Sequence, residues 1–250
     1  MSGVVPVFLV LWDVDFTLVN TRGAGIYLYQ LAFTDLYGRS LPEAAAGANM
    51  AGRTDRAIAL DVLALAGIPD PALEVFRFEA ALARFAPGTA CLVAKVGYAM
   101  PGAGAAIAAL ACVPGVRQSL LTGNVRAMAR VKLEPFGLTE HLDLDAGAYG
   151  NESEVRADLV GLARTRAAAA AADDDGAGYS GQATVLVGDT PLDVEAALAT
   201  GARAVGVATG QFSTDDLQAA GAHAVLPDLT DTGKVVAAVL GPAAEILGAR

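Results

Sequence analysis

A near-continuous apolar run over residues 4–12 ends directly at two acidic residues, Asp13 and Asp15, which are separated by one position. Unbroken runs rich in Val and Leu are typical of strands that are buried on both faces of a parallel sheet. The run is too short to span a bilayer and has no basic segment before it, which argues against a signal peptide. We therefore interpret it as a buried strand that delivers two carboxylates to one edge of a sheet.

Further apolar runs alternate with helical patterns along most of the chain. Strands are expected over residues 116–121, 142–146, 184–187, 202–208 and 224–226. Helices are expected over residues 102–112, 125–134, 153–172, 192–199 and 214–220. This alternation predicts an α/β fold with a doubly wound parallel sheet. Of the 250 residues, 54% are hydrophobic, which is enough apolar material for a buried core.

One segment, residues 21–97, breaks the alternation because it contains no convincing strand. Helical patterns instead cover residues 24–37, 53–66, 71–84 and 90–96. Glycines near both junctions, at Gly23 and Gly97, provide hinges. The sequence therefore predicts two domains: an α/β core formed by residues 1–20 and 98–250, and an inserted α-helical cap domain formed by residues 21–97.

The formal net charge of −10 restricts the partners of this chain. An acidic surface argues against binding to nucleic acid and to anionic membranes. A phosphorylated substrate must then be attracted by local cations, meaning a metal ion and a few Arg or Lys side chains. No apolar run reaches membrane length, so we expect a soluble, cytoplasmic protein. The sequence does not indicate the oligomeric state.

Residue counts also limit the chemistry. With only two histidines, and with two cysteines that lack metal-ligand spacing, a histidine-rich metal site or a Cys/His nucleophile pair is not expected. Cys91 and Cys112 lie in apolar stretches and are expected to be reduced and buried. Three adjacent aspartates, residues 173–175, fall in a low-complexity stretch and are interpreted as a solvated loop.

Polar residues follow three of the expected strands. Those at the ends of these strands are Asp13, Asp15, Thr122, Asp189 and Asp193. In a doubly wound sheet, ligands bind at the carboxyl ends of the strands, so these side chains are expected to share one cleft. The carboxylates would repel one another unless a cation lay between them. Oxygen ligands without nearby His or Cys favour Mg²⁺.

The spacing of Asp13 and Asp15 has a chemical use. In extended backbone, side chains two positions apart point the same way. One carboxylate can then attack phosphorus while the other handles the proton of the leaving group. Such an attack gives an aspartyl-phosphate, which water hydrolyses, and Mg²⁺ offsets the charge on the phosphoryl oxygens.

Three motifs resemble those of the haloacid dehalogenase-like superfamily. Residues 13–18 (DVDFTL) resemble its first motif, residues 120–124 (LLTGN) its second, and residues 188–193 (GDTPLD) its acidic fourth motif. Their order, their spacing and the helical insert fit nearly the whole chain. The insert is similar to the cap of the phosphoglycolate phosphatase and beta-phosphoglucomutase group. The resemblance implies a Rossmann-like core with a helical cap.

The resemblance also implies roles for the acidic residues. Asp13 would be the nucleophile and a metal ligand. Asp15 would be the acid/base and would lend its backbone carbonyl to the metal. Asp189 would complete the Mg²⁺ site, and Asp193 would support it. The alternative for Asp13 and Asp15 is that they are solvated residues at the end of a strand without a catalytic role. The alternative for Asp193 is that it stabilises the start of a helix.

The second motif would form the phosphate-binding loop, with Thr122 holding a phosphoryl oxygen and Gly123 and Asn124 beside it. An ordinary strand-to-helix turn is the alternative for these residues. Arg53, at a loop-to-helix boundary of the insert, would face the active site in similar capped enzymes. A solvated Arg beside an N-capping Thr54 is an equally weighted reading.

Two departures from the family pattern concern the pocket. Phe16 stands where many members have Gly, so its ring is expected to narrow the pocket and contact the substrate. The family also needs a cation, usually Lys, between the second and fourth motifs, yet no Lys lies between Lys132 and Asp189. We favour Arg156, at the expected start of a helix, over Lys132 for this position.

The combined prediction is a Mg²⁺-dependent phosphatase that hydrolyses a small phosphorylated metabolite. A beta-phosphoglucomutase-like phosphomutase and a metal-independent haloacid dehalogenase are the enzymatic alternatives. A dinucleotide-binding module, suggested by Gly102 and Gly104, lacks the third glycine of that motif. A catalytically silent scaffold is the last alternative. The sequence does not identify the substrate.

Overall fold

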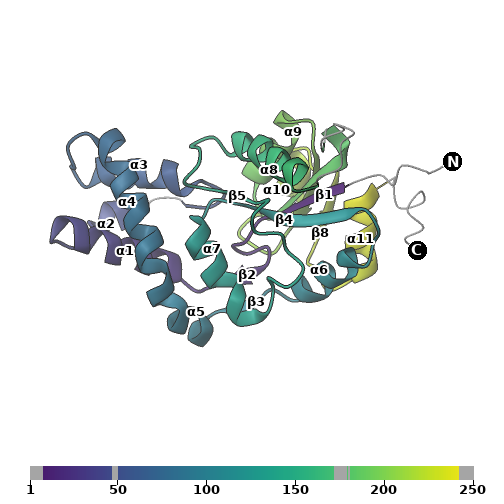
Figure 1. The fold of residues 1–250 in the computed structure, drawn as a ribbon, viewed down its shortest axis with the longest axis horizontal. Coiled ribbons are helices and arrows are strands. Elements are labelled where there is room, and N and C mark those ends of the chain that lie inside the picture. Colours follow the sequence, from purple (N-terminus) through teal and green to yellow (C-terminus); the bar gives the residue numbers. More distant parts are fainter. Residues whose placement is uncertain (1–7, 47–49, 172–178, 180, 242–250) are drawn as a thin grey trace.

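The computed structural model describes residues 8–46, 50–171, 179 and 181–241, and its centre is a six-stranded parallel sheet (Figure 1). The strand order is β5-β4-β1-β6-β7-β8. The strands are β1 (Phe8–Trp12), β4 (Val116–Thr122), β5 (Ala148–Tyr149), β6 (Thr184–Gly188), β7 (Arg203–Val207) and β8 (Ala224–Leu226). This order confirms the predicted doubly wound parallel sheet.

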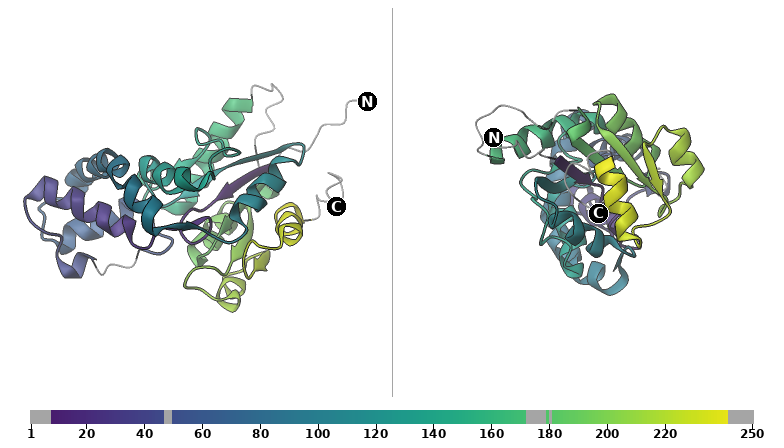
Figure 2. Two further views of the ribbon diagram at one scale, coloured as in Figure 1. Left: turned by 90° about the horizontal axis from the view of Figure 1, so that it is seen from below. Right: turned by 90° about the vertical axis from the view of Figure 1, so that its right-hand side faces the viewer.

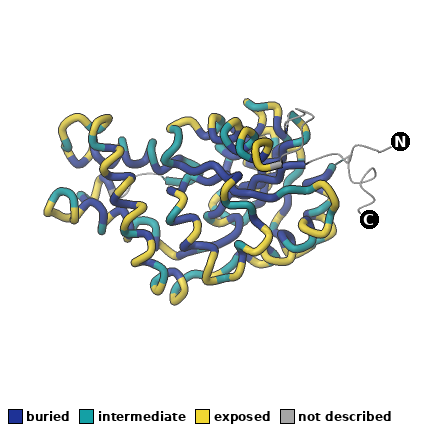
Figure 3. The backbone as a smooth tube through the Cα atoms, in the orientation of Figure 1, coloured by how far each residue is buried: buried dark blue, intermediate teal, exposed yellow. Residues whose placement is uncertain are grey.

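The first strand lies in the middle of the sheet because all five of its residues are apolar and buried. It pairs in parallel with β4 and β6, and Leu11 lies opposite Ser119 and Leu186. Val10 and Trp12 point into the hydrophobic cluster on one face of the sheet, whereas Leu9 and Leu11 point into the cluster on the other. The dark blue stretches of the tube in Figure 3 trace this buried centre.

Helices cover both faces of the sheet (Figure 2). The cluster on one face includes residues of α6 (Ala103–Ala111), α7 (Arg126–Leu133) and α11 (Thr232–Leu240). The cluster on the other face includes residues of α8 (Arg156–Ala171), α9 (Pro191–Ala199) and α10 (Thr214–Ala219). Short 3₁₀ helices lie at Ala86–Thr89, Glu134–Phe136 and Gly181–Ala183.

In the described part of the chain between residues 20 and 98, five α-helices, here called the helical block, form one end of the molecule (Figure 1). They are α1 (Ala24–Tyr37), α2 (Glu43–Ala46), α3 (Asp55–Leu65), α4 (Pro71–Phe85) and α5 (Ala90–Val96). The block has its own hydrophobic cluster, to which Met128 and Val131 of α7 also belong. Ala129 and Leu133 of α7 pack in the sheet cluster instead. Helix α7 is therefore the seam between block and sheet, and the division into domains at residues 20/21 and 97/98 stays a prediction.

The block joins the sheet through two chain segments that pair with each other. β2 (Val19–Asn20) and β3 (Tyr98–Ala99) are antiparallel, with Val19 opposite Ala99 and Asn20 opposite Tyr98. The two predicted hinge regions are thus held side by side by this short ladder.

Several expectations from the sequence need correction. The strand expected at residues 142–146 is absent, because the Asp143 carboxylate accepts hydrogen bonds from the backbone N–H groups of Asp145 and Ala146 and forms a turn. Strand β5 follows it instead. Cys91 and Cys112 are exposed and not buried.

Some expectations concern residues that the structure does not describe. These are residues 4–7 of the first expected strand, residue 172 of the helix expected over residues 153–172, and the aspartates at 173–175. The helix expected from residue 153 begins at Arg156. Among the described residues, none of the helices has both the length and the apolar character needed to cross a membrane.

Candidate active site

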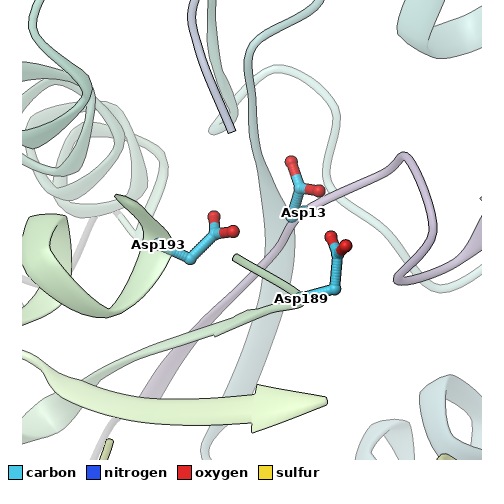
Figure 4. A group of neighbouring side chains, drawn as sticks. All are labelled: Asp13, Asp189 and Asp193. Atoms are coloured by element: carbon cyan, nitrogen blue, oxygen red, sulfur yellow. The ribbon is translucent and has the colours of Figure 1, made fainter. Parts of the chain in front are cut away.

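Three carboxylates from two strand ends meet at the carboxyl edge of the sheet (Figure 4). Asp13 follows β1, and Asp189 and Asp193 follow β6. One oxygen from each lies within 4.8 Å of the others, and all three side chains are buried. Hard oxygen donors at this spacing suit Mg²⁺, so the residues fit the predicted metal site. The Asp15 side chain is not part of this cluster, and the use of its backbone carbonyl as a metal ligand stays a prediction.

Burial makes the charged forms of these carboxyls costly. Burial raises the pKa of Asp13 to about 7, with Arg156 opposing the shift and Asp193 and Asp15 adding to it. Burial also raises the pKa of Asp189 to about 9, and the negative charge of Asp13 adds to that shift. A bound divalent cation would reverse both effects by stabilising the ionised forms.

Arg156 is the cation that reaches the nucleophile candidate. Its Nη2 donates to Asp13 Oδ1 at 2.7 Å and also to Asp193 Oδ1, and its side chain is 6% exposed. Its Nη1 donates to the carbonyl oxygen of Gly52, in the helical block, at 3.1 Å. Its Nε is buried and has no hydrogen-bond partner among the described residues. A buried donor without a partner is costly, which is unusual for a residue outside a functional site.

Lys132 also enters the site, but at another carboxylate. Its Nζ lies 2.7 Å and 2.6 Å from the two oxygens of Asp15 and 2.7 Å from Asn124 Oδ1. Both candidates for the cation of the third motif therefore lie in the site, but at different carboxylates. Arg156 contacts Asp13, whereas Lys132 contacts Asp15.

The second motif lies between these two acidic residues. Asn124 Nδ2 donates to Thr122 Oγ1 at 2.8 Å and to Asp15 Oδ2 at 2.7 Å. Thr122 is fully buried at the end of β4. Gly123 is required by close approach, because a Cβ there would lie 2.0 Å from the carbonyl oxygen of Arg53. The structure thus brings the loop against both the acid/base candidate and the helical block.

We expect Gly123→Ala to separate the block from the sheet edge, because the added Cβ meets backbone that cannot move aside easily. The expected result is a loss of roughly tenfold or more in kcat/KM, since small displacements of an active site are costly. Gly161→Ala in α8 is the matched control, because nothing lies within 4 Å of a Cβ there. The control should keep activity and gain about 0.5–1 kcal/mol in unfolding free energy. Equal activity of the two variants would contradict the interpretation.

A cavity of about 560 Å³ lies between the block and the carboxyl edge of the sheet. From the sheet side it is lined by residues that include Asp13, Asp15 and Asn124. From the block it is lined by residues that include Ile26 and Arg53. The predicted site residues that line it are Asp13, Asp15, Phe16, Arg53, Thr122, Gly123, Asn124, Lys132, Arg156 and Asp189.

Arg53 shows features of both readings from the sequence. It lines the cavity, yet its Nη2 donates to Asp61 Oδ2 at 2.7 Å and to the carbonyl oxygen of Ala57 at 3.2 Å. Thr54 is indeed the N-cap of α3, because its side chain accepts from Ala57 N. A role of Arg53 in substrate binding stays a prediction.

Phe16 has a backbone conformation that favours glycine. Its φ is 59°, in the left-handed region, and its carbonyl oxygen accepts from Thr209 Oγ1 at 2.6 Å. The residue is 43% exposed and lines the cavity. Left-handed backbone costs a non-glycine residue about 1–2 kcal/mol.

Two substitutions can separate the ring of Phe16 from its backbone strain. Phe16→Ala removes the ring and keeps the strain, whereas Phe16→Gly removes both. Phe16→Gly should therefore unfold at the higher denaturant concentration, with a difference of about 1 kcal/mol. Both variants should change KM for bulky substrates alike, because both open the cavity. A more stable Phe16→Ala would contradict the strain argument.

Asp55 is a site residue that the sequence did not identify. Its carboxylate accepts from Val125 N at 2.6 Å and from Tyr29 Oη at 2.7 Å, so it links α1, α3 and the start of α7. Its backbone N–H donates to the carbonyl oxygen of Gly123 at 2.6 Å. Burial raises its pKa to about 6. A single Asp after an N-capping Thr gives no sign of a partner about 70 positions away.

Gly210 was also missed. A Cβ at this position would lie 1.8 Å from Asp189 Oδ2, so only glycine leaves room for that carboxylate. The residue lies in a loop after β7, and no regular spacing connects it to Asp189.

Comparison with known proteins places this site in a family. A sequence family described as haloacid dehalogenase-like hydrolase matches residues 10–198. No curated protein matched the chain in a sequence search.

Solved structures with the same fold cover nearly all of the chain. One is a predicted phosphatase from Clostridium acetobutylicum, with 15% identity, a TM-score of 0.66, and coverage of 92% of this chain and 99% of the other. Another is a candidate beta-phosphoglucomutase from Bacteroides vulgatus, with 15% identity, a TM-score of 0.60, and coverage of 95% and 90%. A phosphonoacetaldehyde hydrolase-like protein from Oleispira antarctica has 19% identity, a TM-score of 0.60, and coverage of 96% and 95%. At these identities the likeness establishes the fold.

Proposed function

We propose that this chain, which belongs to the haloacid dehalogenase-like hydrolase family, hydrolyses a small phosphomonoester with Mg²⁺ as its cofactor. The supporting observation is the buried cluster of Asp13, Asp189 and Asp193 beside the Arg156 guanidinium. Four carboxylates, counting Asp15, face two buried cations, Arg156 and Lys132. Two negative charges remain uncompensated when all are ionised, which is the charge that one divalent cation would balance.

The metal would be held by Asp13 and Asp189, with the backbone carbonyl of Asp15 and support from Asp193. When bound, it would neutralise charge on the phosphoryl oxygens. Arg156 lines the cavity and would bind the phosphoryl group, and it keeps Asp13 oriented through Nη2. Thr122 and the backbone of the second-motif loop would hold a second phosphoryl oxygen.

The reaction would proceed in two displacements at phosphorus. An oxygen of Asp13 forms a bond to phosphorus while the bond to the leaving-group oxygen breaks, and Asp15 gives that oxygen a proton. Water then attacks the phosphorus of the aspartyl-phosphate, and Asp15 takes a proton from this water. Inorganic phosphate leaves, and both carboxyl groups return to their starting states.

The helical block would act as the cap that excludes bulk water from the cavity. Apolar residues such as Ile26 and Met50 line the cavity from the block, and Phe16 lines it from the loop after β1. A small phosphorylated metabolite with a partly apolar leaving group fits this lining. The cytoplasmic location expected from the sequence stays a prediction.

A phosphomutase is the second candidate, because it uses the same residues and because the fold is shared with a candidate beta-phosphoglucomutase. The test is a panel of phosphomonoesters assayed for phosphate release with Mg²⁺ and with a chelator. Sugar phosphates are also analysed for isomers, and 2-haloacids for halide release. Mg²⁺-dependent phosphate release supports the proposal. Isomers without phosphate release, halide release without metal, or no turnover at all would contradict it.

A further inference from the structure

The buried ammonium group of Lys132 is fully engaged within the active site. Its side chain is 4% exposed, and its Nζ contacts both oxygens of Asp15 and Asn124 Oδ1 at 2.6–2.7 Å. An ammonium group has three donors, and these three acceptors satisfy them. All of these acceptors belong to Asp15 or to the second-motif loop, so Lys132 is not a surface lysine that happens to lie near the cavity.

The position of Lys132 follows from the orientation of α7. Neighbouring basic residues of the helix point outward, where Arg126 pairs with Asp145 and Arg130 with Glu134. Other side chains of α7 pack in the sheet cluster or in the block cluster. The Lys132 side chain lines the cavity between the block and the sheet. There it also approaches α1, since a Cβ at Gly25 would lie 3.9 Å from its Nζ.

The two cations of the site contact different carboxylates. The contacts of Arg156 are with Asp13 and Asp193, and those of Lys132 are with Asp15. Asn124 connects the second pair to the phosphate-binding loop, because it accepts from Lys132 and donates to Asp15 and to Thr122. The Asp15 carboxylate is therefore held from two sides by groups that are themselves fixed.

We propose that Lys132 is a positioning residue for proton transfer by Asp15. Its contacts hold the Asp15 carboxylate in one rotamer and tie it, through Asn124, to the loop that would bind the phosphoryl group. Proton transfer to the leaving group needs this alignment because it works only at hydrogen-bond distance. The inference rests on the proposed phosphatase function and adds a residue that is distinct from the cation at Asp13.

The consequence depends on the leaving group. A phenolate with strong electron-withdrawing substituents leaves without a proton, whereas phenolate itself gains more from one. Loss of Asp15 alignment should therefore slow the hydrolysis of phenyl phosphate far more than the hydrolysis of 2,4-dinitrophenyl phosphate. Positioned proton transfer contributes about 10²–10⁴ in rate, so roughly a hundredfold loss for the poorer leaving group is expected. The activated ester should lose less than about fivefold.

The experiment compares Lys132→Met with Asp15→Asn and with the double variant. The value of kcat/KM is measured with Mg²⁺ for a series of phenyl phosphates from 2,4-dinitrophenyl to unsubstituted phenyl, because it reports the first phosphoryl transfer. Lys132→Met and Asp15→Asn should both steepen the dependence of kcat/KM on leaving-group basicity, and the double variant should add little further loss. Arg130→Met, an exposed residue of the same helix, is the matched control and should match the wild type.

The outcomes separate this inference from the proposed function. When the wild type hydrolyses the esters, Lys132→Met can show either the same loss of kcat/KM for every ester or no loss of kcat/KM. In both cases the positioning role is wrong and the phosphatase proposal stands. If the wild type hydrolyses none of the esters, both are wrong. Circular dichroism checks the fold of each variant. If Lys132→Met does not fold, Lys132→Gln replaces it, because Gln keeps a polar group but removes the charge. Lys132→Gln should show the same steeper dependence of kcat/KM on leaving-group basicity.

Discussion

Asp13→Asn should reduce phosphatase activity by roughly 10⁴-fold or more, because an amide cannot supply the attacking oxygen. The change is nearly isosteric, and its amide oxygen can still accept from Arg156 Nη2. The variant should therefore fold normally. Turnover is measured under Mg²⁺ with the best substrate from the phosphomonoester panel.

The stability of this variant gives a second readout. Burial raises the pKa of Asp13 to about 7, so ionised Asp13 is disfavoured in the folded, metal-free protein. A neutral Asn removes this cost, and the metal-free variant should melt at a higher temperature than metal-free wild type at pH 8. Asp215→Asn, an exposed position in α10, is the matched control and should change neither activity nor melting. Wild-type turnover by Asp13→Asn would rule out its role as nucleophile.

Removal of the metal has the second largest expected effect. A chelator should reduce turnover by roughly 10³-fold or more, because charge on the phosphoryl oxygens and on Asp13 would lose its main counter-charge. Activity should return on addition of Mg²⁺. Asp189→Asn should resemble the chelated enzyme and should not be restored at ordinary Mg²⁺ concentrations.

The pH dependence of melting tests the same site without turnover. The pKa of Asp13 is raised to about 7 and that of Asp189 to about 9, above the ordinary value of 3.8. The folded, metal-free protein then binds more protons than the unfolded chain, so their contribution to stability is fully present below about pH 4 and is lost as the pH rises through 7 and 9. Mg²⁺ should therefore raise the melting temperature more at pH 9 than at pH 5. At a hundred times its dissociation constant, the gain is about 2.7 kcal/mol. An equal gain at both pH values would contradict the site.

The sheet could be predicted from the sequence because its strands are buried runs with clear ends. Residues 184–187 and 224–226 were located almost to the residue, and they correspond to β6 (Thr184–Gly188) and β8 (Ala224–Leu226). The two-residue strands β2 and β3 could not be predicted, because their pairing is long-range and two residues have no periodicity. The alternating pattern of residues 142–146 predicts a strand, but the structure has a turn there, because the Asp143 carboxylate accepts hydrogen bonds from the backbone N–H groups of Asp145 and Ala146.

The site divides in the same way. Asp13, Asp189 and Asp193 could be placed together because parallel strands share one carboxyl edge. The partners of Arg156 and Lys132 could not be assigned, because these contacts span 143 and 117 positions and depend on how α7 and α8 pack. Docking of the block through Asp55 is likewise a property of tertiary packing.

Trapping of the phosphoenzyme identifies the nucleophile directly. The enzyme is mixed with substrate and Mg²⁺, quenched in acid within the first turnover, and reduced with borohydride, which converts an acyl-phosphate of Asp to homoserine. Peptide mass spectrometry then locates the change. We expect homoserine at position 13, only when both substrate and Mg²⁺ are present. Modification at Asp15 or at another carboxyl, or none in an enzyme that releases phosphate, would contradict it.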